Sequence, residues 1–165
     1  MAEHPLSPVE ILLVEDNLSD SRLIQEFLGQ GAVPHRIHVV PDGVAALDFL
    51  HAHGRYAWAP RPDLILLDLD LPRMNGLEVL RYVKRDVQLV DIPVIVLTAS
   101  AIAEDVLQAY RLQANCYVTK PADLDGFAEM VQAVEAFWLT CVRLPCPEED
   151  RGQAAAPARK RNDKP

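Results

Sequence analysis

Acidic residues stand directly after two apolar stretches of the chain. Glu15 and Asp16 follow the apolar run at 11–14, Asp68 closes a second apolar run, and Asp70 comes two residues later. Carboxylates gathered within a few ångströms raise one another's pKa unless a hard cation or a lysine compensates. Mg²⁺ binds a few carboxylate oxygens, a carbonyl and retained waters, and leaves room for a phosphate oxygen. The four acids therefore predict a magnesium site.

Two further side chains extend this chemistry. Thr98 follows the apolar run at 93–97, and Lys120 follows the short run at 116–119. A lysine and a hydroxyl that face metal-bound carboxylates suit a phosphoryl group, because phosphoryl transfer depends mostly on positioning and on neutralising charge. Four solvated loop acids are the alternative interpretation. It is disfavoured because loop acids seldom follow two separate buried strands directly.

The elements that must position these residues are β-α repeats. Runs rich in Val, Ile and Leu alternate with stretches of helical period, which is typical of a buried parallel sheet. Strands are predicted at 10–14, 36–40, 63–68, 93–97 and 116–119. Helices are predicted at 23–28, at 44–50 with Asp42 as cap, at 77–83, at 102–112, and from the cap Asp123 to Leu139. Right-handed crossovers bring strands one and three together, and ligands collect at the carboxyl ends of such strands.

These residues, in this order and strand context, resemble the response-regulator receiver family. The resemblance rests on Glu15-Asp16, Asp68, Thr98-Ala99 and Lys120-Pro121, and it covers roughly Val9 to Leu139. It implies an α/β, doubly wound, flavodoxin-like fold. The implied five-stranded parallel sheet has the order 2-1-3-4-5, as in the chemotaxis receiver, with helices on both faces.

The resemblance also implies the role of each acid. Asp68 would accept a phosphoryl group from the phosphohistidine of a sensor histidine kinase, forming an acyl phosphate. Asp16 and Asp68 would hold Mg²⁺, Glu15 would act through metal-bound water, and the backbone carbonyl of Asp70 would complete the protein ligands. The Asp70 side chain is further expected to alter the lifetime of the acyl phosphate. The chain would then be a phosphoacceptor with self-catalysed phosphotransfer and slow autodephosphorylation, not an enzyme.

The switch implied by the resemblance involves three further positions. Thr98 and Lys120 would contact the new phosphoryl oxygens, and Thr98 would move inward and leave space for Tyr117 to turn. The surface of the fourth helix, fifth strand and fifth helix would change as a result. For Tyr117, simple packing of an aromatic on a strand is the alternative. The Lys120-Pro121 bond is expected to be cis, which in general only an X-Pro bond tolerates cheaply.

Two enzyme or ligand-binding hypotheses compete with this one. Asp68-Leu69-Asp70 imitates the Asp-x-Asp of haloacid-dehalogenase-type phosphatases, with Asp68 as nucleophile and Asp70 as general acid. That hypothesis leaves Glu15 and Asp16 unexplained. A nucleotide- or flavin-binding domain is disfavoured, because the seven glycines form neither a Walker loop nor a Gly-x-Gly-x-x-Gly motif.

Composition restricts partners and location. A net charge of −8 with a pI near 5.0 would repel a phosphate backbone, so nucleic-acid binding is not expected. Every long apolar stretch is interrupted by a charge before the ~18 residues that a membrane span needs. The three cysteines show no Cys-x-x-Cys spacing, which argues against a zinc site and a disulfide framework. A cytoplasmic protein without membrane contact is expected.

Length argues for a stand-alone domain. After Leu139 only about 26 residues remain, too few for a separate output domain. We expect a flexible N-terminus at 1–8, a receiver domain with a hydrophobic C-terminal extension at 9–145, and a disordered tail at 146–165, where apolar periodicity ends. Such a receiver would act by binding a partner.

The end of the last helix carries more apolar surface than one packing face needs. Phe137, Trp138 and Leu139 predict a homodimer seam, whereas packing of this segment on its own domain is the alternative. The loop from His51 to Arg61 and the helix end at 137–139 resemble stand-alone receivers that serve phytochrome-type histidine kinases. A kinase of that type is therefore the expected partner.

Overall fold

Five strands and five α-helices alternate along residues 7–145, the part of the chain that the structure, a computed structural model, describes. The strands are β1 (Val9–Val14), β2 (His35–Val40), β3 (Leu64–Leu67), β4 (Val94–Thr98) and β5 (Cys116–Thr119). The helices are α1 (Leu18–Leu28), α2 (Gly43–Leu50), α3 (Gly76–Arg85), α4 (Ala103–Arg111) and α5 (Leu124–Glu135). The five predicted strands are confirmed, each to within one residue at either end.

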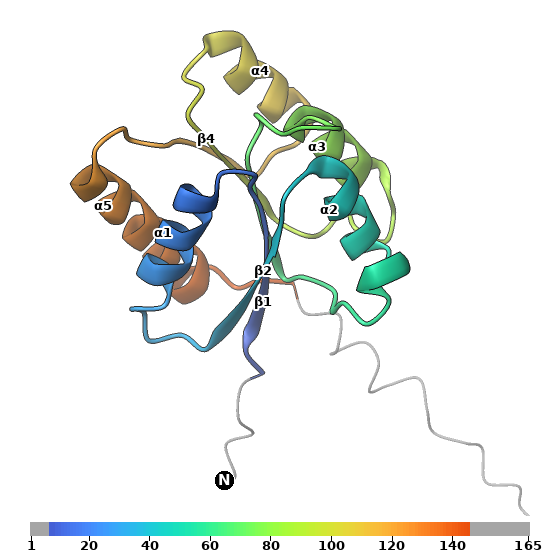
Figure 1. The fold of residues 1–165 in the computed structure, drawn as a ribbon, viewed down its shortest axis with the longest axis horizontal. Helices are drawn as coiled ribbons and strands as arrows, with labels where there is room; N and C mark the ends of the chain where they lie inside the picture. Colours follow the sequence, from blue (N-terminus) through green and yellow to red (C-terminus); the bar gives the residue numbers. More distant parts are fainter. Residues whose placement is uncertain (1–6, 146–165) are drawn as a thin grey trace, which may run out of the picture.

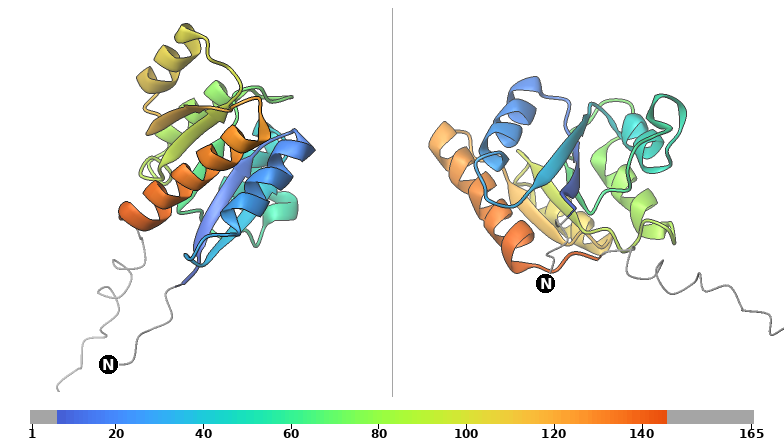
Figure 2. Two further views of the ribbon diagram at one scale, coloured as in Figure 1. Left: turned by 90° about the vertical axis from the view of Figure 1, so that its left-hand side faces the viewer. Right: turned by 90° about the horizontal axis from the view of Figure 1, so that it is seen from below.

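The strands form one parallel sheet of order β2-β1-β3-β4-β5. Helices α1 and α5 lie side by side on one face, and α2, α3 and α4 cover the other (Figures 1 and 2). The order and the helices on both faces confirm the doubly wound, flavodoxin-like fold. This arrangement puts all five strand ends, and the loops that follow them, along one edge.

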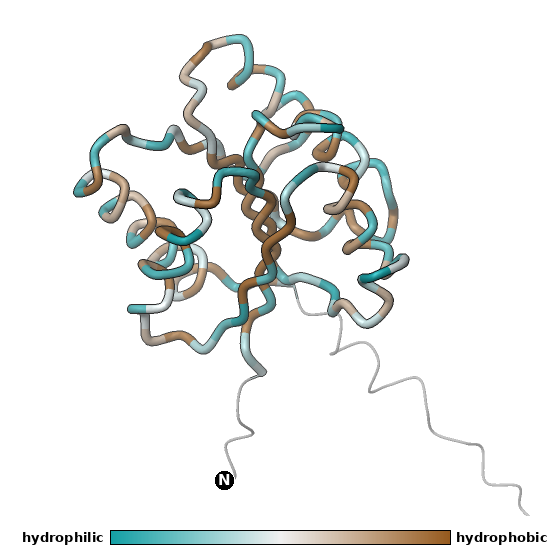
Figure 3. Tube along the Cα trace, in the orientation of Figure 1, coloured by the Kyte–Doolittle hydropathy of each residue, from teal (hydrophilic) through white to brown (hydrophobic). Residues whose placement is uncertain are grey.

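The strand sequences are continuously apolar because both faces of the sheet are covered. In β3, Leu64 and Leu66 belong to the core under α1 and α5, whereas Ile65 and Leu67 belong to the core under α2 and α3. Hydrophobic residues accordingly concentrate along the central strands (Figure 3). Burying each such side chain stabilises the fold by about 1.5–3 kcal/mol relative to exposure. The two cores hold the site-bearing strand ends rigidly.

Side-chain caps fix where the helices begin. Asn17, Asp42, Asn75 and Asp123 each accept a backbone N–H from the first turn of α1, α2, α3 and α5, respectively. The caps predicted at Asp42 and Asp123 are confirmed. Asn75 forms a reciprocal capping box with Glu78, which sets the start of the helix that follows the β3 loop.

The C-terminal end differs from its prediction. α5 ends at Glu135 and continues as a π-helical segment, η2 (Ala136–Cys141). A helical chain therefore runs through Leu139 as predicted, but its hydrogen-bonding pattern changes after Glu135, which was not predicted. Apolar spacing alone does not distinguish the two hydrogen-bonding patterns. Trp138 and Leu139 pack against the core under α1 and α5, which was the alternative for them, whereas Phe137 is 56% exposed.

The α2–β3 connection is partly ordered into a short 3₁₀ turn, η1 (Gly54–Tyr56). Trp58, two residues beyond it, is almost fully exposed. Within residues 7–145, no helix is both long and apolar enough to cross a bilayer. Residues 1–6 of the flexible N-terminus expected at 1–8, and the tail expected at 146–165, lie outside the described part of the chain.

Candidate functional site

Strand register brings the first and third strand ends level. Val14 of β1 pairs with Leu67 of β3, so Glu15 and Asp68 leave the sheet side by side. The backbone N–H of Asp68 donates to the Val14 carbonyl at 3.0 Å, which extends the pairing to the acid itself. Both acids are thereby positioned by the rigid centre of the sheet.

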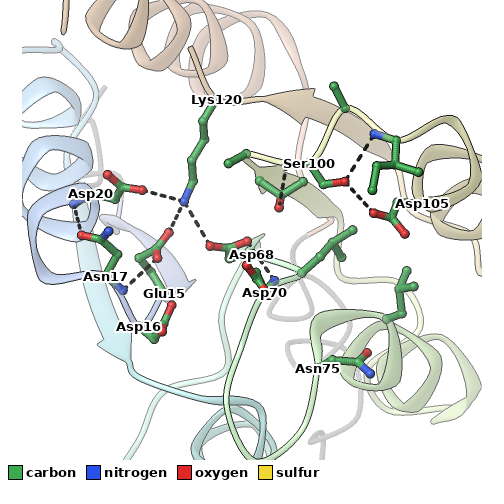
Figure 4. Close-up of a pocket in the computed structure, with 16 residues that line it drawn as sticks. Glu15, Asp16, Asn17, Asp20, Asp68, Asp70, Asn75, Ser100, Asp105 and Lys120 are labelled. Atoms are coloured by element: carbon green, nitrogen blue, oxygen red, sulfur yellow. Dashed lines mark hydrogen bonds and ion pairs between the residues drawn. The ribbon is translucent and has the colours of Figure 1, made fainter. Parts of the chain in front are cut away.

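The fourth and fifth strand ends complete the same edge. Thr98 pairs with Thr119, and the N–H of Lys120 donates to the Thr98 carbonyl at 2.8 Å. A cavity of about 880 Å³ opens at this edge (Figure 4). All six residues from which the site was predicted line it, namely Glu15, Asp16, Asp68, Asp70, Thr98 and Lys120.

The Lys120 ammonium lies at the centre of the acidic cluster. Its Nζ donates to Glu15 Oε2 at 2.5 Å, to Asp20 Oδ2 at 2.9 Å and to Asp68 Oδ2 at 3.1 Å (Figure 4). The side chains of Lys120, Glu15 and Asp68 are at most 8% exposed. An ammonium has three N–H donors, so this arrangement assigns all three to carboxylates.

The surroundings of this cluster raise the pKa values of both Glu15 and Lys120, for different reasons. Burial raises the pKa of the Glu15 carboxyl to about 7, and the hydrogen bonds from Lys120 and Asn17 offset this only in part. For Lys120, burial lowers the pKa, but the hydrogen bonds to Glu15 and Asp20 and the nearby charges outweigh burial and raise it above its ordinary value. Lys120 therefore stays charged at neutral pH.

Three carboxylates are placed so that they could share a cation. Glu15, Asp16 and Asp68 each offer an oxygen, and these oxygens lie within 4.8 Å of one another. Asp16 is exposed at the mouth, and the other two are buried. An all-oxygen set with one open side fits a hard divalent cation such as Mg²⁺ or Mn²⁺. The residues present thus fit the metal that the sequence predicts.

Both carboxylate oxygens of Asp68 have partners. Oδ2 accepts from Lys120, and Oδ1 accepts from the backbone N–H of Asp70 at 3.1 Å. The Asp70 side chain lines the cavity. Gly76 lies so close to the backbone of Asp68 that a Cβ on Gly76 would be 2.2 Å from the Asp68 carbonyl oxygen. The β3–α3 loop is therefore packed tightly against the backbone of Asp68.

On the other side of the cavity, Thr98 and Tyr117 connect to one loop. Thr98 is 1% exposed, and its Oγ1 accepts from the N–H of Ser100 at 3.4 Å. The Tyr117 hydroxyl donates to the Ser100 carbonyl at 2.9 Å, and the Ser100 hydroxyl donates to Asp105 at 2.5 Å. Tyr117 does not line the cavity itself. Its ring is turned toward the β4–α4 loop, and burial raises the pKa of its hydroxyl.

Sequence reasoning missed Asp20 and the Ser100–Asp105 pair. Asp20 lies in the first turn of α1, where an acid already has a local explanation in the helix dipole. The sequence gives no signal for its contact with Lys120, which lies 100 positions away. The expected cis bond at Lys120-Pro121 is wrong, because the described residues contain no cis peptide bond. The trans form is the ordinary preference of an X-Pro bond.

Comparison with known proteins agrees with this geometry. Response regulator Rcp1 of Synechocystis sp. is 47% identical over 145 residues, which make up 88% of this chain and 99% of that protein. The crystal structure of the Mn²⁺-bound form of Rcp1 superimposes with a TM-score of 0.82 at 48% identity, covering 84% of this chain and 100% of its own. The crystal structure of the phosphorylated cyanobacterial phytochrome response regulator RcpA gives a TM-score of 0.82 at 47% identity, with coverages of 85% and 100%.

The family assignment follows from the sequence match as a whole. Residues 11–132 match the response regulator receiver domain, a span that includes Glu15, Asp68, Thr98 and Lys120. The haloacid-dehalogenase alternative finds no support, since it accounts for Asp68 and Asp70 alone. This chain belongs to the response regulator receiver domain family.

Proposed function

We propose that this single-domain receiver accepts a phosphoryl group on Asp68 from a sensor histidine kinase. The observation that carries the proposal is that Asp68 has two kinds of neighbour: its Oδ2 accepts from the Lys120 ammonium at 3.1 Å, and its carboxylate belongs to the metal-competent group with Glu15 and Asp16. The lysine supplies a fixed cation, and the three acids supply a place for a metal cation. A dianionic phosphoryl group needs both.

The proposed step is an in-line displacement. A carboxylate oxygen of Asp68 forms a bond to phosphorus, the P–N bond to the donor histidine breaks, and its electron pair stays on the imidazole nitrogen. Mg²⁺ held by Asp16, Asp68 and the Asp70 carbonyl, with Glu15 acting through water, would supply positive charge to the phosphoryl oxygens. Lys120 keeps its charge and donates to the phosphoryl group.

The same residues suggest how phosphorylation is read out. Thr98 is buried beside the acceptor and shares Ser100 with Tyr117. If the Thr98 hydroxyl donates to a phosphoryl oxygen, the β4–α4 loop, which contacts both Thr98 and Tyr117 through Ser100, would move. We propose that this movement changes the surface formed by α4, β5 and α5, since α4 begins just beyond that loop.

The partner we propose is a histidine kinase of the phytochrome type in the cytoplasm. Support comes from similarity to RcpA, described as a cyanobacterial phytochrome response regulator, over 100% of that chain. A pull-down with a phytochrome kinase core, compared with a non-phytochrome kinase, tests this part separately. We expect the phytochrome core to capture more of the protein, and equal capture by both kinases would argue against the assignment.

Self-association through η2 is the remaining part of the proposal. Phe137 is 56% exposed and stacks edge-on against Trp138 at 5.6 Å between ring centroids. In this proposal the exposed Phe137 ring makes the contact between copies, and Trp138 and Leu139, which pack on their own core, support it from below. Sedimentation at tens of micromolar should give a dimer that Phe137→Ser weakens. A monomer for the unchanged protein would refute it.

Phosphoryl loading tests the proposed function directly. The protein is incubated with acetyl phosphate and Mg²⁺, and the intact mass is compared with that of Asp68→Asn. We expect only the unchanged protein to gain about 80 Da, and only with Mg²⁺ present. Asp48→Asn, an acid on α2 outside the cavity, is the matched control and should load normally. Loading of Asp68→Asn, or none of either protein, would overturn the proposal.

A further inference from the structure

Lys120 has a third carboxylate partner that the metal cluster does not include. Asp20 Oδ2 lies 2.9 Å from Lys120 Nζ, closer than Asp68 Oδ2 at 3.1 Å. The metal-competent group consists of Glu15, Asp16 and Asp68 only. Asp20 therefore acts on the ammonium and not on the cation position.

Asp20 is held in place by its own helix. It lies in the first turn of α1, and its N–H donates to the side chain of the N-cap Asn17 at 3.1 Å. Asn17 in turn donates its N–H to Glu15 Oε1 at 3.0 Å. The two carboxylates that flank Lys120 are thus fixed by one short backbone segment. The Asp20 side chain is 28% exposed, so it lies on the solvent side of the lysine.

The geometry of the ammonium decides what Asp20 can do. Glu15 and Asp20 occupy two of the three N–H donors, which stops rotation of the group about its last bond. The remaining N–H then points toward Asp68 Oδ2. A donor held in this direction needs no reorganisation when a phosphoryl group arrives.

We propose that Asp20 is a positioning residue that orients Lys120 toward the phosphoryl group on Asp68, an inference that rests on the proposed function. Asp20 has no contact with the transferred group. Its hydrogen-bond acceptor, more than its charge, provides the orientation. An asparagine keeps an acceptor oxygen at the same place, whereas an alanine keeps none.

Two other roles for Asp20 predict different effects of its substitution. A merely structural role at the start of α1 would come from its negative charge near the helix N-terminus, and both Asp20→Asn and Asp20→Ala remove that charge. A metal-ligand role would lower the affinity for Mg²⁺. Asp125 occupies the first turn of α5 and is exposed, so Asp125→Ala is the matched control for the loss of a first-turn acid.

The test measures the rate of phosphoryl loading from acetyl phosphate at saturating Mg²⁺. We expect Asp20→Ala to load at least about tenfold more slowly and Asp20→Asn to stay within about threefold of the unchanged protein. Calorimetric affinity for Mg²⁺ should change less than about twofold in both variants. Asp125→Ala should match the unchanged protein. Equal loss in both Asp20 variants, no loss in either, or a parallel loss of Mg²⁺ affinity would overturn the inference.

A second measurement separates this inference from the proposed function. The ¹⁵N signal of the Lys120 ammonium, assigned with Lys120→Arg, reports its order without any phosphoryl donor. We expect the order to fall in Asp20→Ala and to be retained in Asp20→Asn. If the unchanged protein accepts no phosphoryl group while this pattern holds, the proposed function fails and the orientation of Lys120 by Asp20 stands. If loading succeeds and the lysine order is the same in all proteins, Asp20 has no positioning role.

Discussion

Lys120 Nζ lies 2.5 Å from Glu15 Oε2, although 105 positions separate the two residues in the chain. Both side chains are buried, so solvent cannot compensate one charge if the other is removed. Removing one member of a buried ion pair leaves an uncompensated charge, which costs more than the pair itself contributes. Lys120 therefore stabilises the acidic edge of the sheet by balancing the carboxylates that meet there.

Lys120→Met should lower the free energy of unfolding in EDTA by about 3 kcal/mol, since three carboxylates lose their shared cation. Mg²⁺ should restore part of this loss, because the metal supplies charge to the same acids. Urea denaturation with and without Mg²⁺ measures both effects. Lys84→Met is the control, since among residues 7–145 the Lys84 ammonium donates to uncharged oxygens of Val90, Ile92 and Asn115 only. A loss that Mg²⁺ restores equally in both variants would contradict the expectation.

Glu15→Gln should change how stability depends on pH. The folded pKa of about 7 exceeds the ordinary value of 4.5, so the folded state binds more protons between these values. The contribution of Glu15 is full below pH 4.5 and is lost as pH rises through 7, by up to about 3 kcal/mol. In EDTA, the unchanged protein should lose stability relative to Glu15→Gln across this window. Parallel pH profiles for the two proteins would refute this.

Gly76→Ala should disturb the acceptor loop itself. Its Cβ would lie 2.2 Å from the Asp68 carbonyl oxygen and 2.6 Å from the Leu69 Cα, both of them backbone atoms that cannot swing aside. We expect stability to fall by about 1–3 kcal/mol and phosphoryl loading to slow. Gly54→Ala is the comparison for loading: its Cβ meets nothing within 4 Å, so any stability that it loses comes from its φ of +57° and not from a clash, and it should load normally. Normal loading by Gly76→Ala would show that the loop tolerates the shift.

Tyr117→Phe should separate the switch from the chemistry. It removes the hydrogen bond to the Ser100 carbonyl, so stability should fall by about 1 kcal/mol while loading of Asp68 stays within about twofold. The pKa of the Tyr117 hydroxyl is raised, so this tyrosine should ionise later than an exposed one in an alkaline absorbance titration. The late component should vanish in the variant. Its persistence would assign it to another tyrosine.

The sequence predicted the sheet well because buried parallel strands leave a strong signal. The run at β3 is continuously apolar between Asp63 and Asp68, and register then follows from topology. The acids at the strand ends could be placed for the same reason. A residue directly after a central strand has little freedom in where it lies.

Other features left no distinct signal. The change from α5 to η2 alters which carbonyl each N–H contacts, yet the apolar spacing through Phe137 and Trp138 continues. The contact of Asp20 with Lys120 depends on how α1 packs across the β5 loop, a tertiary fact. The direction of the Tyr117 ring toward the β4–α4 loop depends on its rotamer, and the residue type alone does not specify the rotamer.

The order of the sheet has a consequence for synthesis on the ribosome. After β1 and β2, each new strand pairs with an edge that already exists: β3 with β1, β4 with β3, and β5 with β4. Glu15 and Asp68 therefore emerge with the early part of the sheet, whereas Lys120 comes 52 positions after Asp68. A nascent chain gathers its acids before it has the lysine that balances them, so competence to accept a phosphoryl group is acquired only when translation of the domain is nearly complete.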